Sequence, residues 1–153
     1  MKNIVEVRNL SIDFKVRDGF FGAVDNISFD IQTNKTLALV GESGSGKSVT
    51  AMSIMQLLPV PQATYQIDSS IKFNDKEIIN ASKKELLSIR GNIISMVFQE
   101  PMTSLNPYHK VGNQITESVL LHTNVSKKQA KDEAIELMKL VEIDEVQRRF
   151  NSC

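Results

Sequence analysis

The chain has 153 residues and is 41% apolar, which is typical of one folded domain rather than of a disordered segment. Lys plus Arg number 18, and so do Asp plus Glu, so the chain lacks the basic excess of most nucleic-acid-binding domains. We therefore expect no nucleic acid among its partners. Its single cysteine, Cys153, excludes a disulfide within the chain. The N-terminus lacks the apolar core of a signal peptide, and no apolar run could span a bilayer, so we expect a cytoplasmic protein.

The first third of the chain has the pattern of β-strands. Leu10 to Phe14 alternates apolar and polar residues, as a half-buried strand does, and Arg17-Asp18-Gly19 predicts a turn after it. Ala23 to Ile31 predicts a second strand, followed by a turn at Thr33 to Lys35. Thr36 to Val40 is a short, continuously apolar run, which favours a strand covered on both faces, as in a parallel sheet.

The middle of the chain mixes helix and strand signals. A helical pattern runs from Lys47 to about Leu58 and ends before a proline. Apolar residues at 71, 73, 78 and 79 predict a small strand pair that turns at Asn74-Asp75. Ser82 to Glu85 has the spacing of a capping box and opens a helix that continues to about Ile89.

The remaining part begins with a second continuously apolar run, Ile93 to Phe98, which predicts another buried strand, and residues 99–107 predict a loop. Apolar residues at 111, 115, 119 and 120 then fall on one helix face. Ser126 to Gln129 is a second capping box, and it precedes a helix whose apolar face runs from Ala130 to Val141.

The strongest motif is the loop Gly41-Glu42-Ser43-Gly44-Ser45-Gly46-Lys47-Ser48, which matches the pattern G-x-x-x-x-G-K-[ST]. Its glycines allow positive φ angles, so that bare backbone N–H groups can surround phosphate oxygens. Lys47 supplies a mobile positive charge for the terminal phosphates, and the Ser48 hydroxyl suits a Mg²⁺ ion bridging two of them. The alternative interpretation of these residues is a flexible Gly/Ser linker. The predicted strand before the loop and helix after it favour a phosphate site for ATP.

The residues around this loop resemble a known family. Leu39 to Ala51 resembles the phosphate loop of ABC transporter ATPases, and Met96 to Pro107 resembles their Q-loop. The Q-loop form is similar to the dipeptide/oligopeptide import branch. Together with Leu58-Pro59 and Arg90 to Asn92, it is most similar to the peptide and microcin C importers. The resemblance covers essentially the whole chain.

This resemblance implies roles for individual residues. Gln99 would lie at the Mg²⁺ ion with Ser48, sense the terminal phosphate and contribute with Lys47 to hydrolysis. Phe14 would stack on adenine, although it also fits a strand core, and Phe20 and Phe21 are rivals for that role. Val49 would contact phosphate only through its backbone N–H. Thr103 to Asn106 would lie near the surface that receives the membrane permease. The implied nucleotide-binding residues are Phe14, Gly41, Glu42, Ser43, Gly44, Ser45, Gly46, Lys47, Ser48, Val49 and Gln99.

The implied fold is α/β: a P-loop NTPase (ABC ATPase) core with an N-terminal antiparallel β subdomain and the start of a helical subdomain. Residues 1–35 and about 66–80 would form the β subdomain, and residues 36–58 and 93–107 would form the core with its Q-loop. Residues 108–153 would form an incomplete helical subdomain, making the chain a partial nucleotide-binding domain.

Several family elements do not occur in the 153 residues. There is no Leu-Ser-Gly-Gly-Gln segment, no apolar strand ending in Asp-Glu and no switch histidine, because His109 and His122 lie before the signature position. The ending at Cys153 therefore resembles a truncation, a frameshift or half of a split gene. In the family, the strands that separate 36–40 from 93–98 come later in the chain. We expect these two strands to expose unpaired edges, and the isolated chain to be marginal or prone to aggregation.

The expected function is that of the ATP-binding subunit of a peptide importer, using ATP and Mg²⁺ and peripheral on the inner face of the membrane. Its expected partners are permease subunits, a second ABC ATPase domain and a complementing C-terminal fragment. One alternative is a non-catalytic remnant. Another is an ABC-type ATPase of nucleic-acid metabolism, which the neutral charge balance disfavours. A GTPase is disfavoured because Asn34-Lys35 does not continue as a guanine-reading segment.

Overall fold

A computed structural model describes residues 2–99 and 104–153 of the chain. The chain divides into two compact units, one ending at Leu87 and the other running from Ser88 to Cys153. Each unit has its own architecture, a sheet with helices in the first and a helical cluster in the second.

The first unit is built on one long antiparallel hairpin, β1 (Asn3–Val16) and β2 (Gly19–Gln32). β1 is the central strand, and its apolar side chains at Val7, Leu10 and Ile12 have no exposed surface. The strand alternation in the sequence thus predicts both strands of the hairpin but makes them too short, and the expected turn at Arg17-Asp18 joins them. Bulges shift the register four times, as is common in long twisted hairpins.

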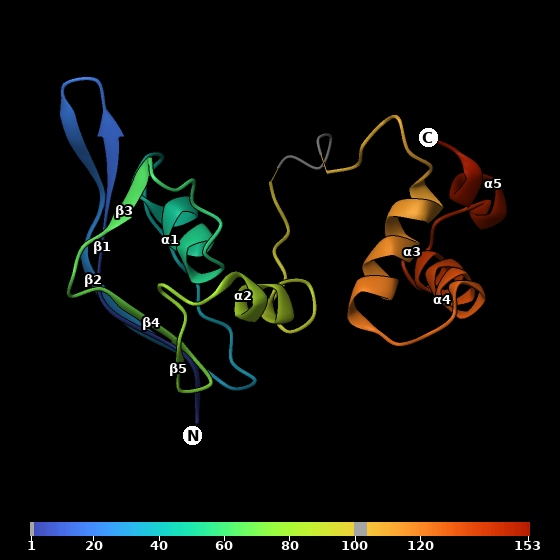
Figure 1. The fold of residues 1–153 in the computed structure, drawn as a ribbon, viewed down its shortest axis with the longest axis horizontal. Coiled ribbons are helices and arrows are strands. Elements are labelled where there is room, and N and C mark those ends of the chain that lie inside the picture. Colours follow the sequence, from blue (N-terminus) through green and yellow to red (C-terminus); the bar gives the residue numbers. More distant parts are fainter. Residues whose placement is uncertain (1, 100–103) are drawn as a thin grey trace. The chain divides into compact units, whose positions relative to one another are not determined.

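Three short strands complete this sheet: β3 (Ala63–Tyr65), β4 (Ser70–Phe73) and β5 (Lys76–Glu77). The strand order is β2-β1-β4-β5, and β3 also pairs with β1, at residues 12–14, whereas β4 pairs with residues 5–8 (Figure 1). Asn74 and Asp75 make the predicted turn between β4 and β5 with φ angles of 47° and 67°. The left-handed backbone at both central residues suits a tight hairpin.

Helix α1 (Lys47–Ile54) begins directly after the glycine-rich loop and ends four residues earlier than the sequence pattern predicts. Gln56 takes a left-handed φ of 53°, and the Leu57 N–H donates to the Met52 carbonyl at 2.9 Å. The Gln56 N–H donates to the Ser53 carbonyl at 2.9 Å. These two bonds form a Schellman motif, which closes a helix without a glycine and explains the overshoot of the prediction.

Helix α2 (Lys83–Ile89) begins at the predicted capping box. The Ser82 N–H and hydroxyl donate to the Glu85 carboxylate at 2.8 and 2.6 Å, and the Glu85 N–H donates back to the Ser82 oxygen at 3.3 Å. Both prediction and structure therefore start this helix at the same residue.

The described part of the second unit contains three packed helices, α3 (Val111–His122), α4 (Lys127–Leu140) and α5 (Val146–Asn151) (Figure 1). Its core consists of Ala134, Ile135, Met138 and Phe150, with Val111, Ile115 and Val146 packed against them. The predicted capping box at Ser126 and Gln129 is present, with both reciprocal hydrogen bonds made. The helical periodicity of this region is therefore confirmed.

The two apolar runs predicted as core strands are not strands in the structure. Residues 36–40 and 93–98 have irregular backbone, apart from an isolated bridge between Arg90 and Ile94. Most of their side chains are exposed, with 86% of Val40 and 95% of Val97 accessible to solvent, whereas Ile94 and Met96 are half-buried. A strand needs a neighbour for its N–H and C=O groups, and within residues 2–99 and 104–153 neither run has a ladder partner.

Of the helices formed by the described residues, none combines the length and apolar character required to cross a bilayer.

Candidate functional site

The glycine-rich loop curls around the ammonium group of its own lysine. Lys47 Nζ donates to the carbonyl oxygens of Gly41 at 2.8 Å and Glu42 at 2.6 Å, and to Ser45 Oγ at 3.3 Å. The loop is thus drawn into a compact turn at the start of α1 rather than extended as a linker. All three acceptors of Lys47 Nζ are neutral oxygens. The negatively charged oxygens of an anion can therefore replace them as hydrogen-bond acceptors of this ammonium group.

Two of the loop's glycines have backbone angles that other residues rarely adopt. Gly44 has a φ of +80° and Gly46 a φ of +84°. A Cβ on Gly46 would lie 2.5 Å from the Ala23 carbonyl oxygen, and one on Gly41 would lie 2.6 Å from Ser45 Oγ. Gly46 is therefore required both for the turn and for the contact between the loop and β2.

The N-terminus of α1 opens from this loop without a side-chain cap. Gly46 is the N-cap residue, and no side-chain cap hydrogen bond is formed at this end by the residues that the structure describes. Ser48 is exposed at this end, and Val49 is half-buried. Thr50 stabilises the turn. It is 3% exposed, and its N–H and hydroxyl both donate to the Gly46 carbonyl, at 2.8 and 3.0 Å. Uncapped N–H groups and the helix dipole favour an anion at this position.

A hollow of about 330 Å³ lies beside the loop, between the loop and β2. It has an apolar wall that includes Val24, Ile27 and Val40, and a polar wall that includes Ser45 and Lys47. The β2 residues were not predicted as part of the site. The contact between Gly46 and Ala23 joins residues more than twenty positions apart, and no local sequence pattern signals it.

Phe14 lies in β1, half-buried, opposite Phe21 of β2 and Ala63 of β3. Its two rivals, Phe20 and Phe21, are 69% and 59% exposed near the hairpin turn. The position of Phe14 in the sheet is therefore sufficient to explain an aromatic residue there, and its stacking on adenine stays a prediction.

Gln99 is an exposed residue of the second unit, at the end of the irregular 93–98 segment. Of the predicted permease-facing segment, Ser104 to Asn106 are described, and Thr103 lies outside the described residues. Asn106 is anchored to α3, because its N–H donates to Gln114 Oε1 at 2.9 Å and its carbonyl accepts from Gln114 Nε2 at 3.0 Å. The roles of these residues stay predictions.

The side chains near the loop suit a Mg²⁺ ion that phosphate oxygens coordinate together with one or two protein ligands. They do not suit an ion coordinated by protein groups alone. In the part of the chain that the structure describes, no group of three or more His, Cys, Asp or Glu side chains could hold a metal ion. Mg²⁺ usually keeps waters and takes one or two protein ligands beside nucleotide phosphates. The exposed Ser48 hydroxyl at the head of α1 fits such a ligand.

Curated relatives cover nearly all of this chain. The oligopeptide transport ATP-binding protein OppD of Bacillus subtilis (strain 168) is 45% identical over 148 residues, which are 97% of this chain and 41% of the relative. The dipeptide transport ATP-binding protein DppD of the same organism is 44% identical, over 98% of this chain and 44% of its own. OppD of Escherichia coli (strain K12) is 42% identical, over 96% and 43%. The chain thus spans less than half the length of these relatives.

Solved structures share the fold. The ATP-binding cassette MJ0796, solved as a dimer in a post-hydrolysis state bound to ADP and Pi, superimposes with a TM-score of 0.80 at 22% identity, over 97% of this chain and 60% of that one. The structure of cbiO1 from Clostridium perfringens gives a TM-score of 0.67 at 21% identity, over 95% and 53%. These matches confirm the predicted cassette fold, apart from the two runs that are not strands.

The model of the family described as ABC transporter matches residues 24–152, a range that holds both the curled loop and the helical unit. Because that match covers most of the chain, the chain belongs to the ABC transporter family.

Proposed function

We propose that residues 41–48 bind the phosphates of ATP together with Mg²⁺. The observation that carries this proposal is the loop curled around Lys47 Nζ at the uncapped start of α1. Backbone N–H groups of the loop and the first turn donate to phosphate oxygens. Lys47 exchanges its bonds to the Gly41 and Glu42 carbonyls for bonds to the terminal phosphates, and Ser48 ligates Mg²⁺. Val49 adds its backbone N–H, Gln99 approaches the metal, and Phe14 stacks on the base.

A titration with a non-hydrolysable magnesium–ATP analogue tests the loop. The amide NMR signals of residues 41–48 are expected to shift, and Lys47→Ala is expected to weaken binding at least about tenfold because it removes a charge-assisted contact. Lys35→Ala, which removes an exposed lysine of the preceding turn, is the matched control and leaves affinity unchanged. Unmoved signals at 41–48 in a folded sample would overturn the proposal.

At the level of the full-length protein, the proposed function is that of the ATP-binding subunit of a peptide importer. The names of the relatives, which include oligopeptide and dipeptide transport ATP-binding proteins, support this. In that role it docks on permease subunits at the cytoplasmic face of the membrane, pairs with a second ABC ATPase domain, and couples ATP binding and hydrolysis to transport. Residues 1–35 and about 66–80 serve as its β subdomain, 36–58 and 93–107 as its core, and 108–153 as its incomplete helical subdomain.

The 153-residue chain by itself has near-zero ATPase activity. Hydrolysis needs a positioned water and stabilisation of charge at the transferring phosphoryl group. The sequence holds neither an Asp-Glu pair after an apolar strand nor a signature segment. Phosphate release by the purified chain should equal that of its Lys47→Ala variant. Turnover well above that of the variant would refute this part of the proposal.

A complementing polypeptide that supplies strands would complete the core. The exposed apolar runs 36–40 and 93–98 support this, because paired backbone and buried apolar side chains are what both runs lack. Co-expression with the C-terminal part of an OppD-type relative should increase the soluble yield and make residues 36–40 resistant to protease. If neither changes, a non-catalytic remnant is the better description of the chain.

A further inference from the structure

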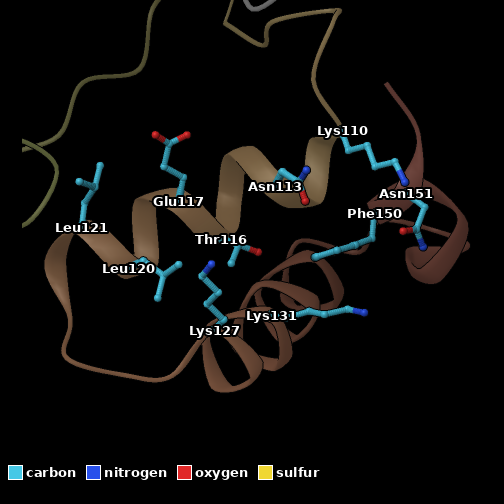
Figure 2. A pocket seen from close by; sticks show the side chains of 10 residues that line it. All are labelled: Lys110, Asn113, Thr116, Glu117, Leu120, Leu121, Lys127, Lys131, Phe150 and Asn151. Carbon is cyan, nitrogen blue, oxygen red and sulfur yellow. The ribbon is translucent and has the colours of Figure 1, made fainter.

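A groove of about 620 Å³ runs along the second unit, between α3, α4 and α5. Its floor is apolar and includes Leu120, which is half-buried, and Phe150, which is 5% exposed. Figure 2 shows Thr116 and Leu120 of α3 pointing toward α4, and Lys127 of α4 pointing toward α3. The volume suits a few side chains of a peptide segment.

The rim of this groove is basic. Lys110, Lys127 and Lys131 line it, against the single carboxylate of Glu117. Lys131 Nζ lies 5.5 Å from the centroid of the Phe150 ring, so one ammonium group stands over the apolar floor. Among the described residues, none of the three lysines forms an ion pair. Three unpaired ammonium groups around an apolar floor favour an occupant that carries both carboxylates and apolar side chains.

The turn after α4 on the same unit has that composition. Leu140 is 78% exposed and Val141 is 66% exposed, and the carboxylates of Glu142 and Asp144 follow at once. Neither carboxylate is in an ion pair within the described part of the chain, whereas Glu145 is paired with Arg148.

The turn has a fixed shape. Glu142 has a φ of 57°, its N–H donates to the Lys139 carbonyl at 2.9 Å, and the Ile143 N–H donates to the Met138 carbonyl at 3.1 Å. This Schellman motif fixes the backbone of the turn, so that Leu140, Val141 and the two carboxylates project from the surface in a defined arrangement before any partner binds.

We propose that the groove receives the turn 140–144 of a second copy of this chain. The two features are complementary in charge and in apolar character, and a single contact accounts for both exposed surfaces. Because Lys127 and Lys131 of the groove lie in the first half of the 14-residue helix α4 and the turn follows its end, an antiparallel arrangement of two α4 helices makes the contact twice and closes a dimer. The contact needs no nucleotide, so it is independent of the proposed function of the phosphate loop.

A charge-swap experiment on the full 153-residue chain tests the contact by sedimentation velocity without nucleotide. One variant carries K127E with K131E, and the other carries E142K with D144K. In each variant alone, groove and turn have the same sign of charge, so the dimer dissociation constant should rise at least about tenfold. An equimolar mixture of the two variants pairs opposite charges in both contacts and should restore dimers. Dimerisation of the unmodified chain should weaken as NaCl rises from about 50 to 500 mM.

Lys83→Glu with Lys84→Glu makes the same change of charge on α2, in the first unit, and should leave dimerisation unchanged. Far-UV circular dichroism of every variant checks that the helices remain folded. Three results would each overturn the proposal: a monomeric unmodified chain at the highest concentration, variants that self-associate as the unmodified chain does, or a mixture that stays monomeric.

Discussion

At the scale of single residues, Gly46 is the point where the phosphate loop meets the sheet. Its φ is +84°, and a Cβ added to it would lie only 2.5 Å from the Ala23 carbonyl oxygen. Gly46→Ala should destabilise the first unit by about 1–3 kcal/mol from the left-handed backbone, with a further loss from the displaced contact. Urea unfolding followed by the amide signals of β2 measures this change.

Gly44 offers a matched control for that substitution. It has nearly the same φ, +80°, but a Cβ there would meet nothing within 4 Å. Gly44→Ala should therefore cost only the backbone strain and should be the milder of the two variants. Equal losses for both variants would show that the contact between Gly46 and Ala23 contributes nothing to stability.

At the scale of elements, the start of α2 depends on the ionised form of Glu85. The hydrogen bond from the Ser82 side chain, followed by that from the Ser82 backbone, lowers the pKa of Glu85 from its ordinary 4.5. A lowered folded pKa means that the cap stabilises the helix above pH 4.5 and that this contribution is lost as the pH falls through the lowered value.

NMR titration of the Glu85 side chain tests this cap. In Ser82→Ala the pKa should rise back toward its ordinary value, because the largest cause of the shift is removed. Ser118→Ala, an exposed serine of α3, is the control and should leave the pKa of Glu85 unchanged. An unaltered Glu85 titration in Ser82→Ala would contradict the role assigned to the cap.

Helix α3 depends on having no side chain at Gly112. A Cβ at this position would overlap the ring of Phe150, which belongs to the core of the second unit. Gly112→Ala gains about 1 kcal/mol of helix propensity but should lose about 1–3 kcal/mol by overpacking, so the net effect is expected to be destabilising. Urea unfolding followed by the amide signals of α4 measures the net change.

A second substitution makes that test specific. In the background of Phe150→Leu, which frees space beside α3, Gly112→Ala should cost less than it does alone, giving a coupling free energy of at least about 0.5 kcal/mol. Additive effects of the two changes would mean that Gly112 and Phe150 do not constrain each other.

At the scale of the whole molecule, the exposed apolar runs make self-aggregation the main risk for the isolated chain. Val97 is 95% exposed within the run 93–98, and unpaired apolar segments are templates for β-pairing between chains. Val97→Asp should reduce light scattering during incubation and change the unfolding free energy by less than about 0.5 kcal/mol, because the side chain packs against little.

Ile67 is the matched control for this prediction. It is 98% exposed but lies in the turn between β3 and β4, outside both runs. Ile67→Asp should leave the aggregation rate unchanged. If both substitutions slow aggregation equally, general surface hydrophobicity rather than the 93–98 run is responsible.

The sequence alone determined the features that depend on neighbouring residues. The start of α1 at Lys47, the caps at Ser82 and Ser126 and the turn at Asn74-Asp75 were all predicted from short patterns, and the structure contains them. Helices follow the same rule, because each backbone N–H finds its acceptor four residues earlier.

Only the tertiary structure decided the state of Thr36 to Val40 and Ile93 to Phe98. An apolar run marks a segment as able to form a buried strand, but the strand exists only when another segment supplies hydrogen-bond partners and a covering layer. Among the described residues no segment does so for either run. The contacts of Gly46 with Ala23 and of Gly112 with Phe150 were equally unpredictable, because each joins residues that are distant in the chain and close only after folding.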